Sequence, residues 1–307
     1  MNILTNKRNR VTSAFLSLLI LLLSPFLPVN RVLASSIKEA NTSQTYFVYD
    51  GETGDFKSYY TLNAVETITA NSSKVIIDTD TREVDFTKNG VVKLLGYTDE
   101  LDPAVGSGFV VDSHTIATAA HCVMAREPAD PFLNCEPQIT TVFVFNGNGD
   151  VEITINNIKE IHIPRSYAVD GNSSCDYALI TVEEDLTDYE MFNLGFPLDS
   201  ITNSSATVYV TGFPQKYNDI YEVNTDTKHT MYTGSGAILN ITETSIIHAA
   251  DSTGGNSGGP IYLSTTFQNK TYYSVIAILT SGGGNQNRGT RITTNLLHFY
   301  KNNPNIS

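Results

Sequence analysis

Short runs of β-branched and aromatic residues recur along the chain from residue 75 onward, and polar turn-forming clusters separate them. Several runs alternate polar with apolar residues, which is typical of half-buried strands. About a dozen strands at this spacing predict an all-β barrel or sandwich. An apolar stripe at helical spacing predicts one helix, over residues 295–302. The runs that we predict as strands are 91–95, 108–111, 115–118, 141–145, 151–155, 158–163, 177–182, 206–211, 236–241, 245–248, 260–263 and 272–279.

The first 34 residues follow a different pattern. Basic Lys7, Arg8 and Arg10 precede an apolar run over residues 14–27, and small residues end at Ala34. This pattern is typical of a secretory signal peptide that is cleaved after Ala34. The alternative is a membrane anchor, but the run is short for a span of about 20 residues. We therefore expect a secreted, extracellular protein without stable membrane insertion.

Residues 35–74 are rich in Ser, Thr, Asn, Glu and Tyr, with few aliphatic side chains. We interpret this segment as a propeptide or an N-terminal arm. Lys74-Val75 is a candidate processing point, because a polar tract there gives way to an apolar run. The alternative is an ordinary loop that enters a first strand, and the residues leave both interpretations open.

The net charge argues against several classes of partner. The formal charge is −13, and removal of residues 1–34 takes away four basic residues and no acidic one, which gives −17. A strongly acidic exported protein repels nucleic acid and anionic lipid surfaces. We therefore expect no nucleic-acid partner.

Three cysteines, Cys122, Cys135 and Cys175, are too few for a disulfide scaffold. Export permits one bridge, and three pairings are possible. We favour Cys122 with Cys135, because the short loop between them would then be fixed beside His121.

The most informative stretch runs from Asp251 to Pro260 and places one serine, Ser257, among glycines. Glycines allow the backbone to turn sharply and to aim successive N–H groups inward. Ser257 is the candidate nucleophile. The N–H groups of Gly255 and Ser257 are candidate oxyanion donors, which must lie about 3 Å from the oxygen that becomes negative.

Two upstream motifs supply the groups that a serine nucleophile needs. His121, in Thr118-Ala119-Ala120-His121-Cys122, follows a predicted strand and is the candidate base. Asp176 precedes the predicted strand 177–182 and is the candidate residue that orients the imidazole. No His or Cys pair has the close spacing of a zinc site, and no Walker-type phosphate loop is present in the sequence.

Together these motifs, with Gly106-Ser107-Gly108 before the histidine, resemble those of chymotrypsin-fold serine proteases. Within that family the segment 253–258 and the turn Gly212-Phe213-Pro214 resemble the secreted V8 or glutamyl-endopeptidase-like group. The resemblance covers about residues 75–302.

The resemblance implies two six-stranded antiparallel β-barrels with a short C-terminal helix, and a catalytic triad in the cleft between the barrels. The protease domain would span residues 75–307, with the first barrel at about 75–190, the second at about 191–293 and the helix at about 294–302. It also implies no metal, no organic cofactor, protein or peptide substrates, and activation by removal of a propeptide. We expect a monomer.

The specificity pocket is less clear from these residues. Glutamyl-specific members carry a histidine where this chain has Thr280. Asp251, six residues before Ser257, has the spacing of the pocket aspartate in trypsin-like enzymes and would favour Lys or Arg at P1. The alternative is a structural aspartate. The candidate pocket residues are Asp251, Ser252, Thr280, Ser281 and Gly282.

The leading hypothesis is a secreted serine endopeptidase that hydrolyses peptide bonds through a Ser-His-Asp triad and an acyl-enzyme. The alternative is a catalytically inactive protease-like binding or adhesion protein. Such proteins usually lose a member of the triad, whereas all three candidates are present here.

Overall fold

The computed structural model describes residues 43–63, 82–97, 103–124, 139–195, 206–215, 229–283 and 286–301. All of them belong to one compact unit, Lys38–Ser307. The predicted signal peptide, the processing point Lys74-Val75 and Cys135 lie outside the described residues. In the part of the chain that is described, no helix has the length and apolar character needed to span a membrane.

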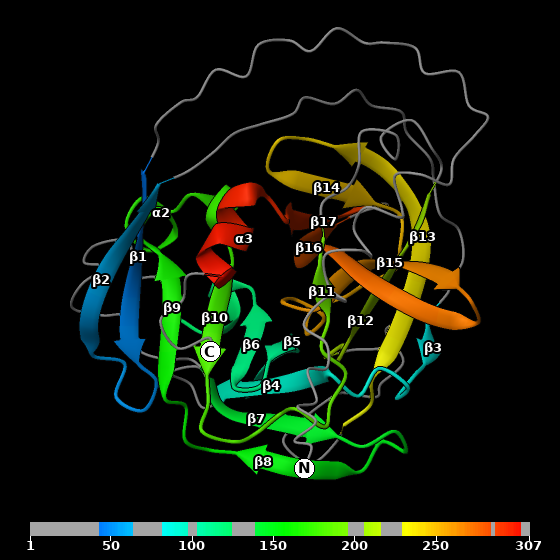
Figure 1. Ribbon diagram of the computed structural model, residues 1–307, viewed down its shortest axis with the longest axis horizontal. Coiled ribbons are helices and arrows are strands. Elements are labelled where there is room, and N and C mark those ends of the chain that lie inside the picture. The colour runs from blue at the N-terminus through cyan, green and yellow to red at the C-terminus, as the bar shows by residue number, and fades with distance from the viewer. Residues whose placement is uncertain are drawn as a thin grey trace, which may run out of the picture. The chain divides into compact units, whose positions relative to one another are not determined.

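Two β-sheets make up most of the fold (Figure 1). The first has nine strands in the order β2-β1-β9-β10-β6-β5-β4-β7-β8, and every neighbouring pair is antiparallel. Its strands are β1 Ser43–Asp50, β2 Phe56–Asn63, β4 Val91–Tyr97, β5 Pro103–Asp112, β6 Thr115–Thr118, β7 Ile139–Phe145, β8 Val151–Ile155, β9 Glu160–Pro164 and β10 Ala178–Thr181.

The second sheet closes on itself. Strand β16 pairs with both β15 and β17, so β16-β15-β12-β13-β14-β17 form a six-stranded barrel. Strand β11 pairs in parallel with β16, and β3 pairs with β13. The bounds are β3 Glu83–Val84, β11 Asn193–Leu194, β12 Thr207–Gly212, β13 Tyr232–Ile241, β14 Ser245–His248, β15 Pro260–Phe267, β16 Lys270–Gly283 and β17 Gln286–Arg291.

The all-β fold class and the C-terminal helix are confirmed, since α3 spans Thr294–Lys301. The short helical segments η1 Ala120–Cys122, α2 Arg165–Ala168 and η2 Ser173–Cys175 join strands of the first sheet. The first sheet has nine strands instead of the six that the resemblance implies. One reason is that the β1–β2 hairpin, from the segment predicted as a propeptide or arm, extends the sheet past β9.

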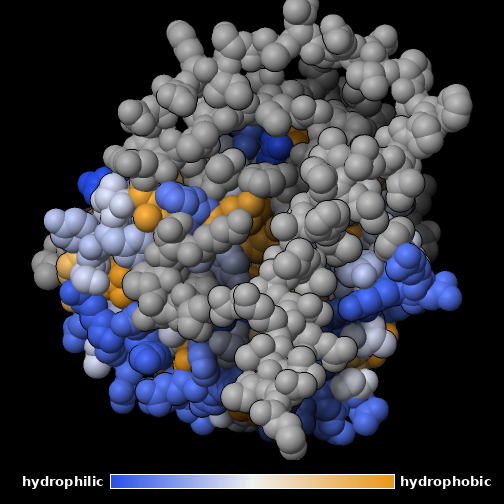
Figure 2. All heavy atoms as spheres, in the orientation of Figure 1, coloured by the Kyte–Doolittle hydropathy of each residue, from blue (hydrophilic) through white to orange (hydrophobic). Residues whose placement is uncertain are grey.

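Aromatic side chains join the two sheets. The rings of Phe145 and Phe213 lie 4.9 Å apart between centroids, and Phe192 lies 5.7 Å from Phe109 and 5.9 Å from Tyr262. Aromatic rings bury large areas and prefer such spacings, so this cluster fixes one sheet against the other. Hydrophilic side chains gather on the described outer surface, for example at the β15–β16 hairpin (Figure 2).

Candidate active site

The register of two central strands brings His121 and Asp176 together. Strands β6 and β10 are antiparallel, and Thr118 at the end of β6 is paired with Ala178 at the start of β10. Both strands are buried along their whole length, because they lie inside the sheet and carry small or branched residues. His121 follows β6 within η1, and Asp176 precedes β10, so both leave the sheet at the same edge.

At this edge the imidazole and the carboxylate are hydrogen-bonded. Nδ1 of His121 lies 2.7 Å from Oδ2 of Asp176, and the backbone N–H of His121 donates to Oδ1 at 3.0 Å. Asp176 is only 7% exposed. Because both carboxylate oxygens are engaged by the same residue, the ring is fixed in rotation and position, and Nε2 is left as its second functional atom.

Burial and two neighbouring groups shift the pKa of His121. Burial lowers the pKa of His121, but the Cys122 sulfur and the Asp176 carboxylate raise it, and the net result lies above the usual value of 6.5. The Cys122 Sγ lies 3.7 Å from Nε2. A raised pKa makes the imidazole a stronger base but requires a higher pH to keep it neutral.

The predicted disulfide between Cys122 and Cys135 is not formed at Cys122. Cys122 and Cys175 are both free thiols and are partly buried. Cys135, which we had paired with Cys122, lies outside the described residues. The contact between the Cys122 sulfur and the imidazole was not predicted from the sequence, and the adjacency of the two residues was its only signal.

The serine loop has the sharp turns that its glycines predict. Gly255 and Gly258 have φ angles of +92° and +84°, in the left-handed region. A Cβ on Gly258 would lie 2.1 Å from Ser107 O and from Thr118 Oγ1. Among the described residues, the N–H groups of Gly255 and Ser257 have no hydrogen-bond acceptor. These two donors are therefore available to a ligand.

Two hydrogen bonds connect the serine loop, through Ser107, with the strands that lead to His121. The N–H of Ser107 on β5 donates to Ser257 O at 2.8 Å, and Thr118 Oγ1 donates to Ser107 O at 2.7 Å. Ser257 therefore lies against the end of β6. Its hydroxyl has no hydrogen bond to another described residue, so the structure joins His121 to Asp176 directly but does not join Ser257 to the imidazole. Such catalytic hydrogen bonds often form only with substrate bound.

Ser107 also holds the oxyanion side of the loop through its side chain. The Ser107 hydroxyl donates to Gly255 O at 2.8 Å and accepts from the Phe213 N–H at 2.9 Å. The side chain is fully buried. This function of Ser107 was not predicted, although a serine in an otherwise apolar strand was a usable signal.

Part of the candidate specificity pocket comes together. A Cβ on Gly282 would lie 1.9 Å from Oδ1 of Asn287 and 3.7 Å from Oγ of Ser252. Asn287 is paired with Gly282 across the β16–β17 ladder, and its Nδ2 donates to Ala250 O at 2.7 Å. Asn287 was not predicted as a pocket residue, because only its pairing with Gly282 brings it near Ser252.

The remaining candidate pocket residues are Thr280, Ser281 and Asp251. Thr280 Oγ1 donates to Arg288 O at 3.4 Å, and Ser281 is exposed. Asp251 is partly buried, and its carbonyl oxygen would lie 2.6 Å from a Cβ on Gly234. Among the described residues, no group of three His, Cys, Asp or Glu side chains could hold a metal ion.

A closed β-barrel packed on a second β-sheet, with a hydrogen-bonded His–Asp pair near a glycine-rich serine loop, is the architecture of the chymotrypsin-fold serine protease family. A family model described as the trypsin-like peptidase domain matches residues 106–266, and the chain belongs to that family.

Two curated relatives are similar over part of the chain. The glutamyl endopeptidase of Bacillus licheniformis is 29% identical over 205 residues, which are 63% of this chain and 58% of the relative. The extracellular metalloprotease of Bacillus subtilis is 26% identical over 196 residues, which are 62% of this chain and 56% of the relative. The chain thus spans less than two thirds of the length of either relative.

Solved structures share the fold. A Glu endopeptidase in complex with MPD has a TM-score of 0.57 at 18% identity, with 74% of this chain and 98% of that chain covered. A thermostable serine protease, AL20, from an extremophilic microorganism has a TM-score of 0.54 at 17% identity, with 70% and 96% covered. At these identities the similarity shows the fold alone.

Proposed function

We propose that the chain is a secreted serine endopeptidase in which Ser257, His121 and Asp176 form the catalytic triad. The observation that carries this proposal is the 2.7 Å hydrogen bond between His121 and Asp176 beside the serine loop. In acyl transfer, Ser257 Oγ attacks the carbonyl carbon of the scissile peptide bond, and His121 Nε2 takes the hydroxyl proton. Asp176 stabilises the imidazolium that forms.

The negative oxygen of the tetrahedral intermediate is stabilised by the N–H groups of Gly255 and Ser257, which are unpaired in the described part of the chain. His121 then gives its proton to the leaving amine, the C–N bond breaks, and an acyl-enzyme remains. Water attacks the ester with His121 as base, which releases the new carboxylate and restores the Ser257 hydroxyl.

The test of this proposal is covalent labelling by a fluorophosphonate probe, together with hydrolysis of a protein substrate. Ser257→Ala should abolish both, whereas Ser264→Ala, at an exposed serine of β15, should leave both unchanged. Unchanged labelling of the Ser257→Ala protein would refute the assignment. If the folded and processed wild-type protein is not labelled at all, the inactive binding or adhesion protein is favoured instead.

Specificity within this function is a separate question. One relative is named a glutamyl endopeptidase, but Thr280 stands where the resemblance implies a histidine. Digestion of a peptide library by the mature protein decides between the options. Cuts after Lys or Arg would support Asp251 as a pocket residue, and cuts after Glu would show that Thr280 can replace the histidine.

We further propose that export removes residues 1–34 and that a second cut at Lys74-Val75 releases the active enzyme. The support is the signal-peptide pattern and the extracellular relative from Bacillus subtilis. N-terminal sequencing of the protein from the culture medium should find Ser35 in the precursor and Val75 in the active form. An active enzyme in which residues 74 and 75 are still joined would contradict the second cut.

A further inference from the structure

The β1–β2 hairpin lies upstream of the proposed second cut but forms part of the catalytic unit. Strand β1 pairs with β9 over five residues, from Tyr46 opposite Pro164 to Asp50 opposite Glu160. Strand β9 in turn pairs with β10, which follows Asp176. The compact unit that contains the protease fold begins at Lys38 and so includes the hairpin.

The hairpin contributes four consecutive buried side chains to the first sheet. Tyr46, Phe47, Val48 and Tyr49 are between 0% and 5% exposed. Phe47 and Tyr49 belong to the hydrophobic core on one face of the sheet, and Tyr46 belongs to the core on the other face. Because both faces of β1 are buried, removal of the hairpin would expose apolar surface on both faces of β9.

Tyr46 contacts two elements near the candidate active site. Its ring stacks on Phe299 of α3 with centroids 4.2 Å apart and an angle of 6°, and α3 lies beside β1 in Figure 1. Its hydroxyl lies 3.2 Å from the hydroxyl of Tyr177, the residue after Asp176. The hairpin therefore packs against the C-terminal helix and against the segment that carries the carboxylate.

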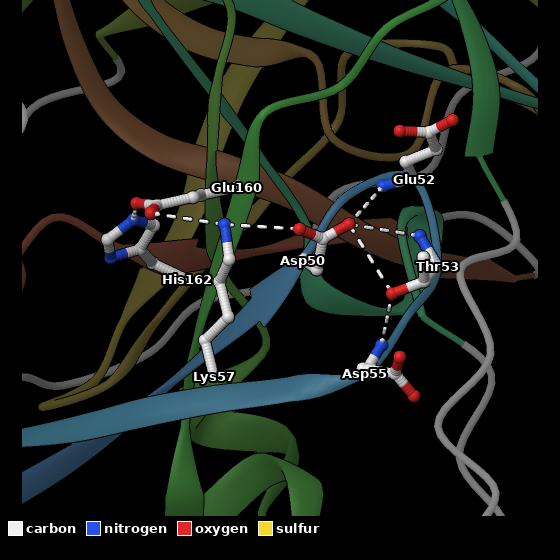
Figure 3. Close-up of polar contacts among 7 residues, drawn as sticks. All are labelled: Asp50, Glu52, Thr53, Asp55, Lys57, Glu160 and His162. Carbon is white, nitrogen blue, oxygen red and sulfur yellow. Dashed lines mark hydrogen bonds and ion pairs between the residues drawn. The ribbon is translucent and has the colours of Figure 1, made fainter.

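A polar network also joins the β1–β2 hairpin to β9 (Figure 3). Lys57 Nζ on β2 lies 3.1 Å from Asp50 Oδ2 and 3.6 Å from Glu160 Oε1 on β9. Glu160 Oε2 also lies 3.1 Å from Nε2 of His162, and Tyr60 of β2 lies 3.4 Å from Nδ1 of that histidine. The Lys57 ion pairs are partly exposed and contribute little to the strength of the attachment, whereas His162 is fully buried.

We infer that the edge of β9, with Tyr177 and Phe299, is a binding surface for the chain's own hairpin, which stays attached non-covalently after the chain is cut between β2 and β3. Its occupant is residues 43–63, and the mature enzyme is then a two-chain complex. This inference rests on the proposed removal of an N-terminal segment, but its test does not depend on catalysis.

The test uses the Ser257→Ala chain from Ser35 onward, so no self-cleavage occurs. Residues 68–74 are replaced by the recognition sequence of a site-specific protease, and the cut chain is run on size-exclusion chromatography with intact mass spectrometry of the peak. We expect both fragments to co-elute in equal amounts. An N-terminal fragment that elutes alone, while circular dichroism shows the large fragment still folded, would overturn the inference.

Two variants and a control identify the surface. Tyr46→Ala should weaken the binding of the small fragment by about a hundredfold, as expected for loss of a buried aromatic side chain. Tyr46→Phe keeps the ring and should change the binding by tenfold or less. Tyr59→Ala, at a tyrosine of β2 that is 67% exposed, should have no effect.

If Tyr46→Ala prevents folding of the uncut chain, the cut but otherwise unchanged complex is titrated with urea. Release of the small fragment well before the large fragment unfolds would then argue against a shared structure. One common midpoint for both transitions would support it.

Discussion

Ser107→Ala is a direct test of how the serine loop is held. The change removes one hydroxyl that accepts from the Phe213 N–H at 2.9 Å and donates to Gly255 O at 2.8 Å. It leaves in place the backbone bond from the Ser107 N–H to Ser257 O and the bond from Thr118 Oγ1 to Ser107 O. The variant thus separates the side chain's contribution from that of the strand.

The expected magnitude follows from the groups left without a partner. Phe213 is fully buried and Gly255 is buried, so one N–H and one C=O lose their hydrogen bonds away from water. Each such group costs about 1–3 kcal/mol, so the two together should lower the folding stability by about 2–6 kcal/mol. Removing an oxyanion donor outright costs about 10²–10³ in kcat. Here the Gly255 N–H remains but is less well fixed, so we expect kcat to fall by about 10- to 100-fold.

The assay is steady-state hydrolysis of a peptide substrate at a temperature where a urea titration shows the variant to be folded. KM should change little, because oxyanion contacts strengthen only in the transition state. Ser58→Ala, at an exposed serine of β2, serves as control. A folded Ser107→Ala enzyme with unchanged kcat, or one with raised KM and unchanged kcat, would show that the hydroxyl does not fix the oxyanion loop.

Three further predictions concern the same site. Asp176→Asn should lower kcat by about four orders of magnitude, because the ring loses its orienting acceptor, and a variant that keeps a tenth of the activity would contradict this function. Cys122→Ala removes a group that raises the pKa of His121. Because kcat/KM rises with pH as His121 loses its proton, this rise should move to lower pH in the variant. An unchanged pH profile would show that the thiol does not affect the base. Gly258→Ala should destabilise the fold by more than about 2 kcal/mol in urea titrations, since its φ is +84° and its Cβ would lie 2.1 Å from Ser107 O.

Sequence patterns located several strands well. The predicted strands 115–118, 151–155 and 245–248 coincide with β6, β8 and β14. Their apolar or alternating residues lie between clear turn signals, so local chemistry and pairing agree. The two-residue strands β3 and β11 were not predicted, because they exist only through pairing with β13 and β16 and have no pattern of their own.

The hairpin over residues 43–63 was not predicted as strands. The segment was judged by its polar composition over forty residues, although Thr45-Tyr46-Phe47-Val48-Tyr49 is itself a run of β-branched and aromatic residues. Its burial depends on partners more than a hundred residues away, since Tyr46 is paired with Pro164 and stacks on Phe299. Such long-range contacts cannot be read from local composition.

The motif Gly106-Ser107-Gly108 shows how alternation along one strand serves two sides of the site. The two glycines point toward the core of the first sheet, where a Cβ on Gly106 would lie 3.1 Å from Cys122 Sγ and one on Gly108 would lie 2.9 Å from Ile116. The missing side chain of Gly106 allows η1, which contains His121, to approach β5, and that of Gly108 allows β6 to lie close. Ser107 points to the opposite face, like Phe109, which packs between the two sheets. Side chains of a strand point alternately to its two faces. The two glycines therefore make room for the segment that carries the imidazole on one face, and Ser107 fixes the serine loop on the other. A one-residue shift of β5 would therefore disturb both halves of the site at once.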